Sequence, residues 1–135
     1  MPTLLEIVSP DRLLLSQPVD MVVIPAAEGE MGVLPNHAPM IVLLQAGTIT
    51  LHEGGRATSR LYVSGGFAEI TPERCTVLAD EAIPVEEVSR KAADARLADA
   101  DTAYTEADKM DMPALDLIMQ RQHAARAMVA AAEAP

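Results

Sequence analysis

Aromatic side chains are almost absent from this sequence. Its 135 residues include no tryptophan, one phenylalanine and two tyrosines, although half of all residues are hydrophobic. Such hydrophobicity argues against a disordered chain. The core must therefore be built from aliphatic side chains, and the bases of a single-stranded nucleic acid would find almost no ring on which to stack.

Basic residues and long apolar runs are also scarce. Ten Lys and Arg stand against twenty Asp and Glu, which gives a net charge of −10. A chain this acidic repels phosphate backbones and anionic lipid headgroups. No stretch approaches the ~18 apolar residues of a membrane span. We therefore expect neither nucleic acid nor direct lipid insertion among its interactions.

The single cysteine, Cys75, excludes an internal disulfide and indicates a reducing compartment. It lies in the strand-like run RCTVLA, where cysteine usually serves as a small buried hydrophobe. The opening residues MPTLLEIVSPDR lack the basic start and apolar core of a signal peptide. These features together predict a cytoplasm-like location.

No arrangement of residues in the sequence suggests catalysis. The histidines His37, His52 and His123 fall in three different predicted elements, away from metal-ligand spacing with one another or with Cys75. Ser64 precedes two glycines but lacks the G-x-S-x-G pattern of an exposed nucleophile. We predict no catalytic residues, no metal site and no cofactor.

Residues 1–84 are typical of a β-sandwich domain. Polar and apolar residues alternate in TITLHE and FAEIT, as in half-buried strands, and HEGGR (52–56) predicts a tight hairpin. No insertion is long enough for a helix. The pattern predicts an antiparallel sandwich of about 8–10 short strands, with a barrel as the related alternative. The strand-like runs are 3–9, 12–17, 19–25, 40–45, 47–53, 59–65, 66–71 and 75–81.

The composition changes after Pro84, where glycine disappears and alanine becomes frequent. Strong helix formers over 85–135 predict a second domain, an antiparallel hairpin of two helices at about 85–109 and 113–132. Pro113 fits because proline is tolerated near a helix start. Within the first helix, Glu86 with Arg90 and Glu87 with Lys91 would form i,i+4 pairs.

The predicted packing surface of this hairpin is weak. Small side chains bury little area, at about 25 cal/mol per Å². We therefore expect the hairpin to be loosely held and able to move. The expected packing residues are Val85, Val88, Ala92, Ala95 and Ala103 in the first helix, and Leu115, Leu117, Ile118, Met119, Met128 and Val129 in the second.

The stretch EGEMGVLPNHAPMI (28–41) is unusually rich in glycine, proline and acidic residues. A phosphate-binding loop is disfavoured because glutamates flank its glycines and would repel an anion. The glycines permit positive φ and the prolines stiffen the chain, so we predict a bent connection. Composition leaves two interpretations open: a rigid platform for another protein, or an ordinary surface loop.

Three segments together resemble the epsilon subunit of bacterial F-type ATP synthase. They are EGEMGVLPNHAPM (28–40), YVSGGFAEI (62–70) and TVLADEAI (76–83), and the resemblance extends over the change from sandwich to helices. It implies a non-catalytic rotor subunit on the cytoplasmic side of the bacterial inner membrane, which clasps the gamma subunit and rests on the c-ring. The implied c-ring contacts are Glu28, Gly29 and Glu30; the implied gamma contacts are His37, Ala38 and Pro39.

Nucleotide binding is not expected. Nucleotide-binding members of this family carry I/L-D-x-x-R-A at the start of the first helix. Here Ser89 replaces the aspartate and Ala92 replaces the arginine. Arg90 cannot substitute, because a two-residue offset rotates a side chain by about 200° around a helix.

The resemblance also raises the question of inhibition. Inhibitory members use basic residues of the second helix against an acidic loop of the beta subunit, within the alpha/beta hexamer. Arg121 and Arg126 are the candidates here, and charges on a solvated helix face are the alternative.

Three functional hypotheses therefore stay open. The chain is a coupling subunit with a weakly regulatory hairpin, a true hairpin-driven inhibitor of ATP hydrolysis, or an independent sandwich that binds a small molecule. The third would need an apolar pocket with convergent polar groups, which the sequence does not indicate.

Overall fold

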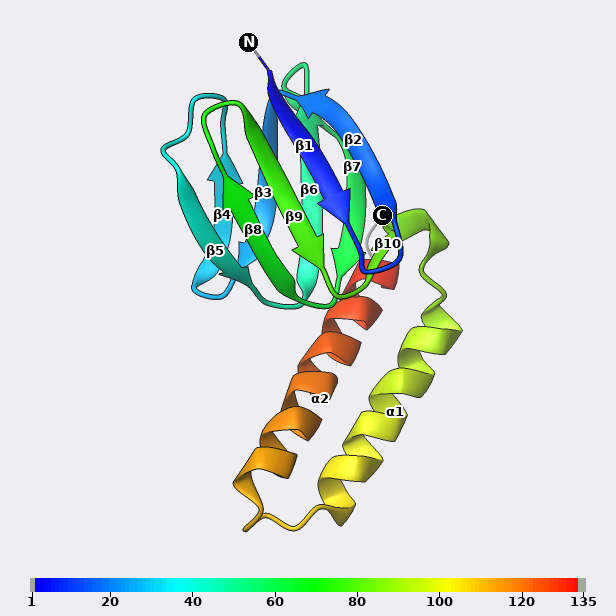
Figure 1. Cartoon of the computed structure of the whole chain (residues 1–135). Helices are drawn as coiled ribbons and strands as arrows, with labels where there is room; N and C mark the ends of the chain where they lie inside the picture. Colours follow the sequence, from blue (N-terminus) through cyan, green and yellow to red (C-terminus); the bar gives the residue numbers. More distant parts are fainter. Residues whose placement is uncertain (1, 134–135) are drawn as a thin grey trace.

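The computed structural model describes residues 2–133 and consists of a β-sandwich followed by a two-helix hairpin (Figure 1), which confirms the predicted fold class. Within these residues the sheet has ten strands. They are β1 (Thr3–Val8), β2 (Leu13–Val19), β3 (Met21–Ala26), β4 (Gly29–Val33), β5 (Met40–Leu44), β6 (Gly47–Glu53), β7 (Arg56–Val63), β8 (Gly66–Ile70), β9 (Arg74–Ala79) and β10 (Ala82–Pro84).

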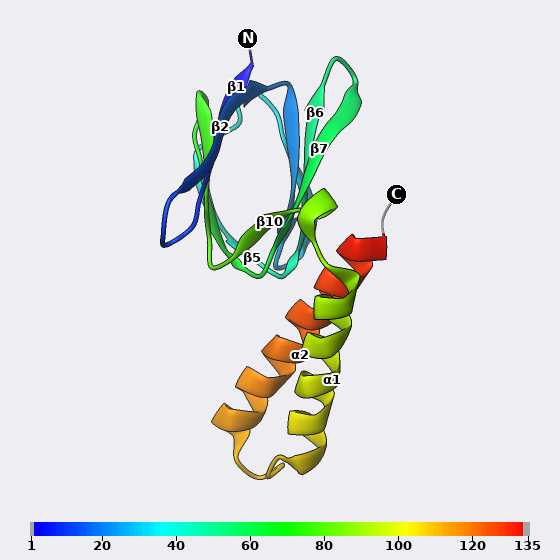
Figure 2. The same cartoon turned by 90° about the vertical axis from the view of Figure 1, so that its right-hand side faces the viewer.

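The strands follow one path, β10-β7-β6-β3-β5-β8-β9-β1-β2, with β4 attached to β3. The sheet folds over into two layers, which Figure 2 shows edge-on. Strands β3 and β5, at the passage between the layers, are paired only through Ala26 and Leu44. The pair β1–β9 is parallel, whereas the other pairs are antiparallel, a detail that the pattern of short runs did not indicate.

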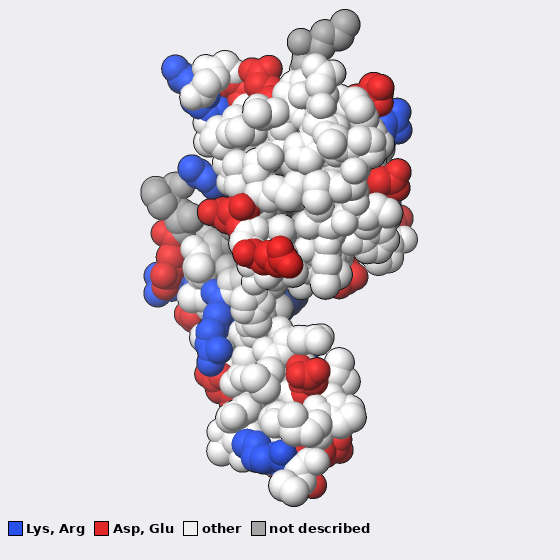
Figure 3. All heavy atoms as spheres, turned by 90° about the vertical axis from the view of Figure 1, so that its left-hand side faces the viewer, with Lys and Arg blue, Asp and Glu red and all other residues white. Residues whose placement is uncertain are grey.

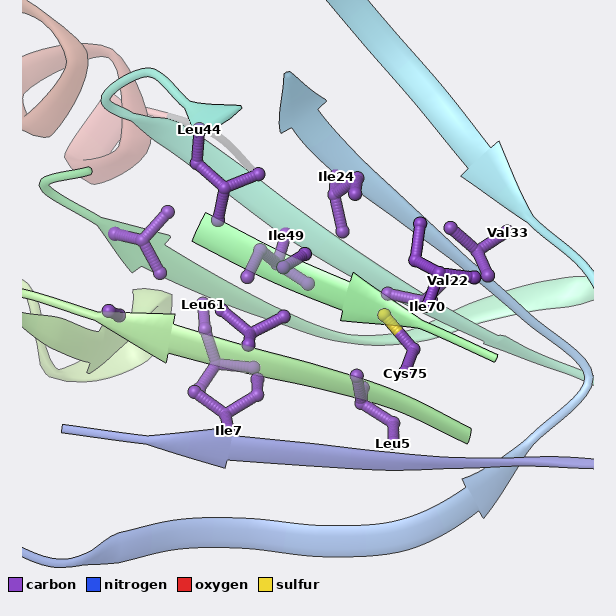
Figure 4. Packing of buried hydrophobic residues seen from close by; sticks show 14 of the residues in the cluster. Leu5, Ile7, Val22, Ile24, Val33, Leu44, Ile49, Leu61, Ile70 and Cys75 are labelled. Carbon is purple, nitrogen blue, oxygen red and sulfur yellow. The ribbon is translucent and has the colours of Figure 1, made fainter. Parts of the chain in front are cut away.

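The core lies between the two layers and is aliphatic, as predicted (Figure 4). Alternate residues of each strand point inward; in β1, for example, Leu5 and Ile7 are fully buried. Cys75 is also fully buried among Leu, Ile and Val side chains, and this burial raises the pKa of its thiol to about 11. The prediction that Cys75 serves as a small hydrophobe is confirmed.

The bent connection predicted at residues 28–41 is only partly correct. Gly29 has a positive φ of 133°, as expected for a turn residue, but it also begins β4. This strand pairs with β3 from Ala26–Gly29 to Val22–Val33. Val33 is fully buried, so the segment contributes to the core despite its glycines. The two glycines had obscured a strand in which Met31 and Val33 alternate with polar or small residues.

The first helix starts later than predicted. A 3-10 turn, η1 (Val85–Glu87), precedes α1 (Arg90–Glu106), and the Ser89 hydroxyl caps α1 by accepting a hydrogen bond from the Ala92 backbone N at 3.1 Å. The expected i,i+4 pairs of Glu86 and Glu87 are therefore wrong, because both glutamates lie outside the helix. Arg90 instead forms ion pairs with Asp94 at 3.9 Å and with Glu133 at 2.9 Å.

The hairpin turn lies between α1 and α2 (Met112–Glu133), so α1 ends three residues before the expected residue 109. Asp111 caps α2: its Oδ1 atom accepts a hydrogen bond from the Ala114 backbone N at 3.3 Å. Pro113 falls in the first turn of α2, where its missing N–H costs nothing. The predicted position of Pro113 near a helix start is confirmed.

The predicted packing face of the hairpin is partly wrong. Ala92 and Ala95 are exposed, and their places are taken by Ala93 and Ala100. Because each residue advances a helix by about 100°, an error of one residue in the phase exchanges buried and exposed positions. In α2, Leu115 and Met128 are buried as predicted and Ile118 and Val129 are half-buried, whereas Leu117 and Met119 are exposed.

Gly66 is the position where the backbone itself demands glycine. Its φ is 129°, and a Cβ atom would lie 2.0 Å from the carbonyl oxygen of Leu78 on the neighbouring strand β9. Nothing flexible can move aside there. At Gly32, by contrast, an added Cβ would meet only the Met21 sulfur at an ordinary 3.6 Å.

We expect Gly66→Ala to lower the free energy of unfolding by about 2 kcal/mol or more, because backbone strain and a backbone clash add together. Gly32→Ala is the matched control and should stay within about 1 kcal/mol of the native chain. Thermal unfolding followed by circular dichroism measures both variants. Equal midpoints for the two would show that β8 and β9 do not need this close approach.

Candidate interaction surfaces

The two predicted contact sets lie at opposite ends of the sandwich. Glu28 lies in the β3–β4 turn and Gly29 and Glu30 begin β4; these three residues, called the acidic turn below, are at the end of the sandwich that carries the helices, whereas residues 37–39 follow β4 at the other end (Figure 1). The structure therefore does not bring these sets together. All three residues of the acidic turn are exposed, and Glu28 and Glu30 present carboxylates at the surface.

The segment at the far end is held in a defined shape. Asn36 has a φ of 66°, and its backbone N donates a hydrogen bond to the Pro72 carbonyl at 2.9 Å. His37 is half-buried, with its Nδ1 atom 2.8 Å from the carbonyl oxygen of Ala38. Ala38 and Pro39 are exposed and lead directly into β5.

An apolar row crosses the outer face of the layer that contains β5, β8, β9, β1 and β2. Leu43 pairs with Phe67, Phe67 with Leu78, Leu78 with Val8, and Val8 with Leu13, so the five residues form one continuous line of cross-strand neighbours. Leu43 is 67% exposed and Phe67 44%. Contiguous exposed apolar side chains of this kind are typical of an interaction surface.

The apolar row continues into the acidic turn. The Ala27 backbone N donates a hydrogen bond to the Leu43 carbonyl at 2.9 Å, and a groove of about 550 Å³ lies between Glu28–Glu30 and the exposed side chains of Met40, Ile41 and Leu43. Figure 3, seen from the left-hand side of Figure 1, shows a broad area of the sandwich without charged side chains, with acidic and basic groups at its margins. Exposed apolar side chains and the acidic turn are thus neighbours on one side of the molecule.

The sequence pattern did not reveal this row. Alternation in each strand could have shown which residues point outward, but the strand order and register decide that five of them become neighbours. The separate runs MIVLLQ and GFAEIT carry no information about their pairing.

Polar side chains of Tyr62, Glu81 and Arg96 join the sandwich to the hairpin. The Tyr62 hydroxyl, on β7, donates a hydrogen bond to the Ala124 carbonyl of α2 at 3.0 Å. Arg96 of α1 donates from Nη1 and Nη2 to the two carboxylate oxygens of Glu81, at 2.8 and 3.1 Å. The hydrogen bonds that Arg96 donates to Glu81 raise the pKa of the Arg96 guanidinium. Neither contact was predicted from the sequence. The position of Tyr62 between the apolar residues Leu61 and Val63 could have indicated that the outer face of this strand is covered by another element.

A second apolar cluster, the junction cluster, surrounds Tyr62. Its buried members are Tyr62, Ala93, Met128 and Ala131, and partly buried Ile83, Val85, Val88, Ala127 and Val129 pack against it. The cluster has no buried residue in common with the sandwich core. The hairpin is thus packed on the outside of a sandwich whose core is complete without it.

The positions compared with the nucleotide motif have local structural roles. Ser89 caps α1, Ala92 is exposed, and Arg90 is engaged by Asp94 and Glu133. The absence of nucleotide binding stays a prediction.

The two candidate inhibitory arginines face different neighbours in this arrangement. Arg126 lies 3.6 Å from Asp101 of α1, whose carboxylate also accepts a hydrogen bond at 2.9 Å from the buried Gln122 side chain. Arg121 instead lines a small cavity of about 230 Å³ between the hairpin and the sandwich, beside Tyr62 and Arg96. Both arginines are exposed, but Arg126 is partly engaged within the hairpin.

Two further findings concern residues 2–133 as a whole. No group of three or more His, Cys, Asp or Glu side chains is arranged to hold a metal ion. Neither helix has the length and apolar character needed to cross a bilayer.

Comparisons with known proteins identify the family. Residues 3–85 match the family model described as ATP synthase, Delta/Epsilon chain, beta-sandwich domain. An ATP synthase epsilon chain of Granulibacter bethesdensis is 68% identical over 130 residues, which cover 96% of this chain and 96% of the relative. An epsilon chain of Gluconacetobacter diazotrophicus is 47% identical over 135 residues, 100% of this chain and 96% of the relative.

A solved structure shows the same likeness over both parts of the chain. One chain of the mitochondrial ATP synthase of Euglena gracilis, determined as OSCP/F1/c-ring in rotational state 1, superposes with a TM-score of 0.80 at 25% identity, covering 96% of this chain and 81% of that chain. The sandwich model defines the class, the delta and epsilon chains of ATP synthase. With the full-length matches, the chain belongs to the epsilon-chain family of bacterial F-type ATP synthases, which confirms the resemblance.

The buried Tyr62 hydroxyl gives a titration that can be measured. Burial, together with the charge of Glu81, raises its pKa from 10.0 to about 12, while Arg96 lowers it. The folded chain therefore keeps this proton when the unfolded chain has lost it. The corresponding stabilisation is fully present below about pH 10 and is lost as the pH rises through about 12.

In a Tyr104→Phe variant, Tyr62 is the only tyrosine, so the ultraviolet absorbance of the phenolate reports it alone. We expect the phenolate to appear near pH 12 in the folded chain, or earlier if alkaline unfolding comes first. Circular dichroism at each pH separates the two events. A folded chain that titrates near pH 10 would show that Tyr62 is accessible to water and not held beneath α2.

Proposed function

We propose that this chain is a non-catalytic central-stalk subunit of the ATP synthase rotor, which clasps gamma, contacts the c-ring and so helps to couple proton flow to ATP synthesis. Family membership and the likeness to an F1/c-ring assembly support the assignment. The observation that carries it is the exposed apolar row on an otherwise acidic protein. A permanent partner surface explains that row better than a free-standing protein does.

The gamma-facing side is assigned to the layer of β5, β8 and β9. The implied gamma contacts His37, Ala38 and Pro39 lead into β5, whose outward residues Ile41 and Leu43 belong to the exposed apolar surface. Interfaces bury their apolar centre and leave polar groups at the rim. The apolar row would form such a centre, with residues 37–39 at one margin.

The c-ring contact is assigned to Glu28, Gly29 and Glu30. This turn is exposed at the end of the sandwich, so it can meet a second partner while the side of the sandwich is covered by gamma. Its two carboxylates suit basic or polar loops. Charge complementarity of this type favours orientation and association rate more than affinity. The chain would thus be peripheral, on the cytoplasmic face of the bacterial inner membrane.

The hairpin is proposed to be a weak regulator of ATP hydrolysis. Arg121 and Arg126 are exposed on α2 and could meet an acidic loop of the alpha/beta hexamer once the hairpin leaves the sandwich. The Asp101 contact favours weak over strong inhibition, because it competes for Arg126. A strong hairpin-driven inhibitor is the alternative. An independent small-molecule-binding sandwich is not favoured by any contact described above.

The gamma assignment can be tested with charges placed in the apolar row. The double variant Leu43→Glu with Phe67→Glu should weaken binding to isolated gamma by about 100-fold or more, since interface centres tolerate charge poorly. Both side chains point outward, so the fold should be retained. Ala57→Glu, an exposed site on β7 of the other layer, is the control. Calorimetric titration that finds native affinity for the double variant would contradict the assignment.

The hairpin is tested by titrating an epsilon-depleted F1 complex with the full chain and with residues 1–84. Because the sandwich core is separate from the junction cluster, we expect both to bind. Only the full chain should slow hydrolysis, and only a few-fold, with Arg121→Ala plus Arg126→Ala removing the effect. Lys91→Ala on α1 is the control. Failure of residues 1–84 to bind would contradict the proposal, and strong inhibition removed by the arginine variants would favour the alternative.

A further inference from the structure

We infer that Tyr62 and the Glu81–Arg96 ion pair form a latch that sets how often the hairpin leaves the sandwich. The inference rests on the proposed function for its consequence, since a detached hairpin matters only if it regulates the enzyme. The latch itself is a property of the isolated chain. Its test can therefore fail while the assignments to gamma and the c-ring stand, and the reverse also holds.

The latch ties each helix to the sandwich separately. The Tyr62 hydroxyl is bonded to the Ala124 carbonyl of α2, and Glu81 is bonded through both carboxylate oxygens to Arg96 of α1. The two ties are neighbours: Tyr62, Glu81, Arg96 and Ala124 line the same small cavity. The polar ties to the two helices therefore lie side by side on the sandwich.

The apolar part of the junction is too small to decide the position of the hairpin alone. Three of the helix residues buried or partly buried there, Ala93, Ala127 and Ala131, contribute only methyl groups. Such side chains bury little apolar area compared with Leu or Ile. Polar contacts that are modest in absolute terms can therefore shift the balance between the compact and detached positions.

The latch can open without damage to the fold. Leu61 and Val63 point into the sandwich core, whereas Tyr62 between them points out into the junction cluster. When the hairpin leaves, the Ala124 carbonyl keeps its place within α2 and the Tyr62 hydroxyl turns to water, so no buried polar group is left without a partner. Arg96 and Glu81 are already half-exposed and are readily hydrated.

Other contacts keep the two helices together during such a movement. Arg90 pairs with Glu133 at 2.9 Å, and Asp101 accepts a hydrogen bond from Gln122 at 2.9 Å. Both join α1 to α2 rather than to the sandwich. The latch therefore governs departure of the hairpin as a unit, and separation of its helices is a later and distinct step.

The test measures the distance between spin labels on the sandwich and on the hairpin. Ser16→Cys on β2 and Thr102→Cys on α1 place labels at exposed sites, and buried Cys75 stays unlabelled. Pulsed electron resonance then gives the populations of compact and detached chains. Tyr62→Phe removes only the hydroxyl and should lower the compact-to-detached ratio about fivefold, the effect typical of one hydrogen bond. Tyr104→Phe, at the far end of α1, is the matched control and should change nothing.

The ion pair is tested by charge and by salt. Glu81→Gln should lower the ratio by a factor of about two to five, less than a buried pair would give, because both partners are half-exposed. Glu6→Gln breaks the Arg74–Glu6 pair, which lies within the sandwich at 3.2 Å, and should leave the ratio unchanged. Added salt should lower the compact-to-detached ratio of the native chain and have little effect on that of Glu81→Gln.

An exchange of charges completes the experiment. Glu81→Arg alone should release the hairpin, and the double variant Glu81→Arg with Arg96→Glu should restore much of the compact population. Native populations in both Tyr62→Phe and Glu81→Gln would overturn the latch. So would a fall in the melting temperature of the sandwich without any change in the label distance, because it would assign both residues to ordinary stability.

Discussion

The sandwich core is filled by Leu, Ile and Val side chains that are individually small, so it closes only when every strand turns its alternate residues inward from both layers. At Gly66 the backbones approach so closely that no Cβ atom fits. This requirement largely restricts the inward-facing residues of each strand to apolar side chains and places no such restriction on the outward-facing residues. Apolar residues that face outward in β5, β8 and β9 are not needed for the core and are available for a partner.

The sequence predicted those features that depend on local pattern. Alternation identified most strands, Gly54 and Gly55 marked the β6–β7 hairpin with positive φ at both, and the loss of glycine after Pro84 marked the helices. Features that depend on pairing were missed: the parallel β1–β9 contact and the apolar row both arise from register. The start of α1 was misplaced because one cap, Ser89, outweighed the helix propensity of the residues before it.

The same distinction between local pattern and long-range pairing applies to the candidate surfaces. The acidic turn and residues 37–39 could be proposed from the sequence because a motif carries them. Their separation by the length of β4 could not, since the segment was interpreted as one bent connection. The contacts of Tyr62, Glu81 and Arg96 join residues of different elements, and no local sequence pattern predicts such contacts.

Leu43 occupies a place with a further consequence. It lies at the end of the apolar row and also lines a groove between the lower edge of the sandwich and α2, where exposed Met119 forms part of the opposite wall. A partner seated on the row therefore borders α2 only while the hairpin is compact. Binding free energies are reciprocal in such a case: whatever affinity the compact hairpin adds for the partner, the partner returns as stability of the compact hairpin. Binding of the partner and the position of the hairpin would then be coupled equilibria. Their coupling free energy could be measured either from the partner's affinity or from the stability of the compact hairpin.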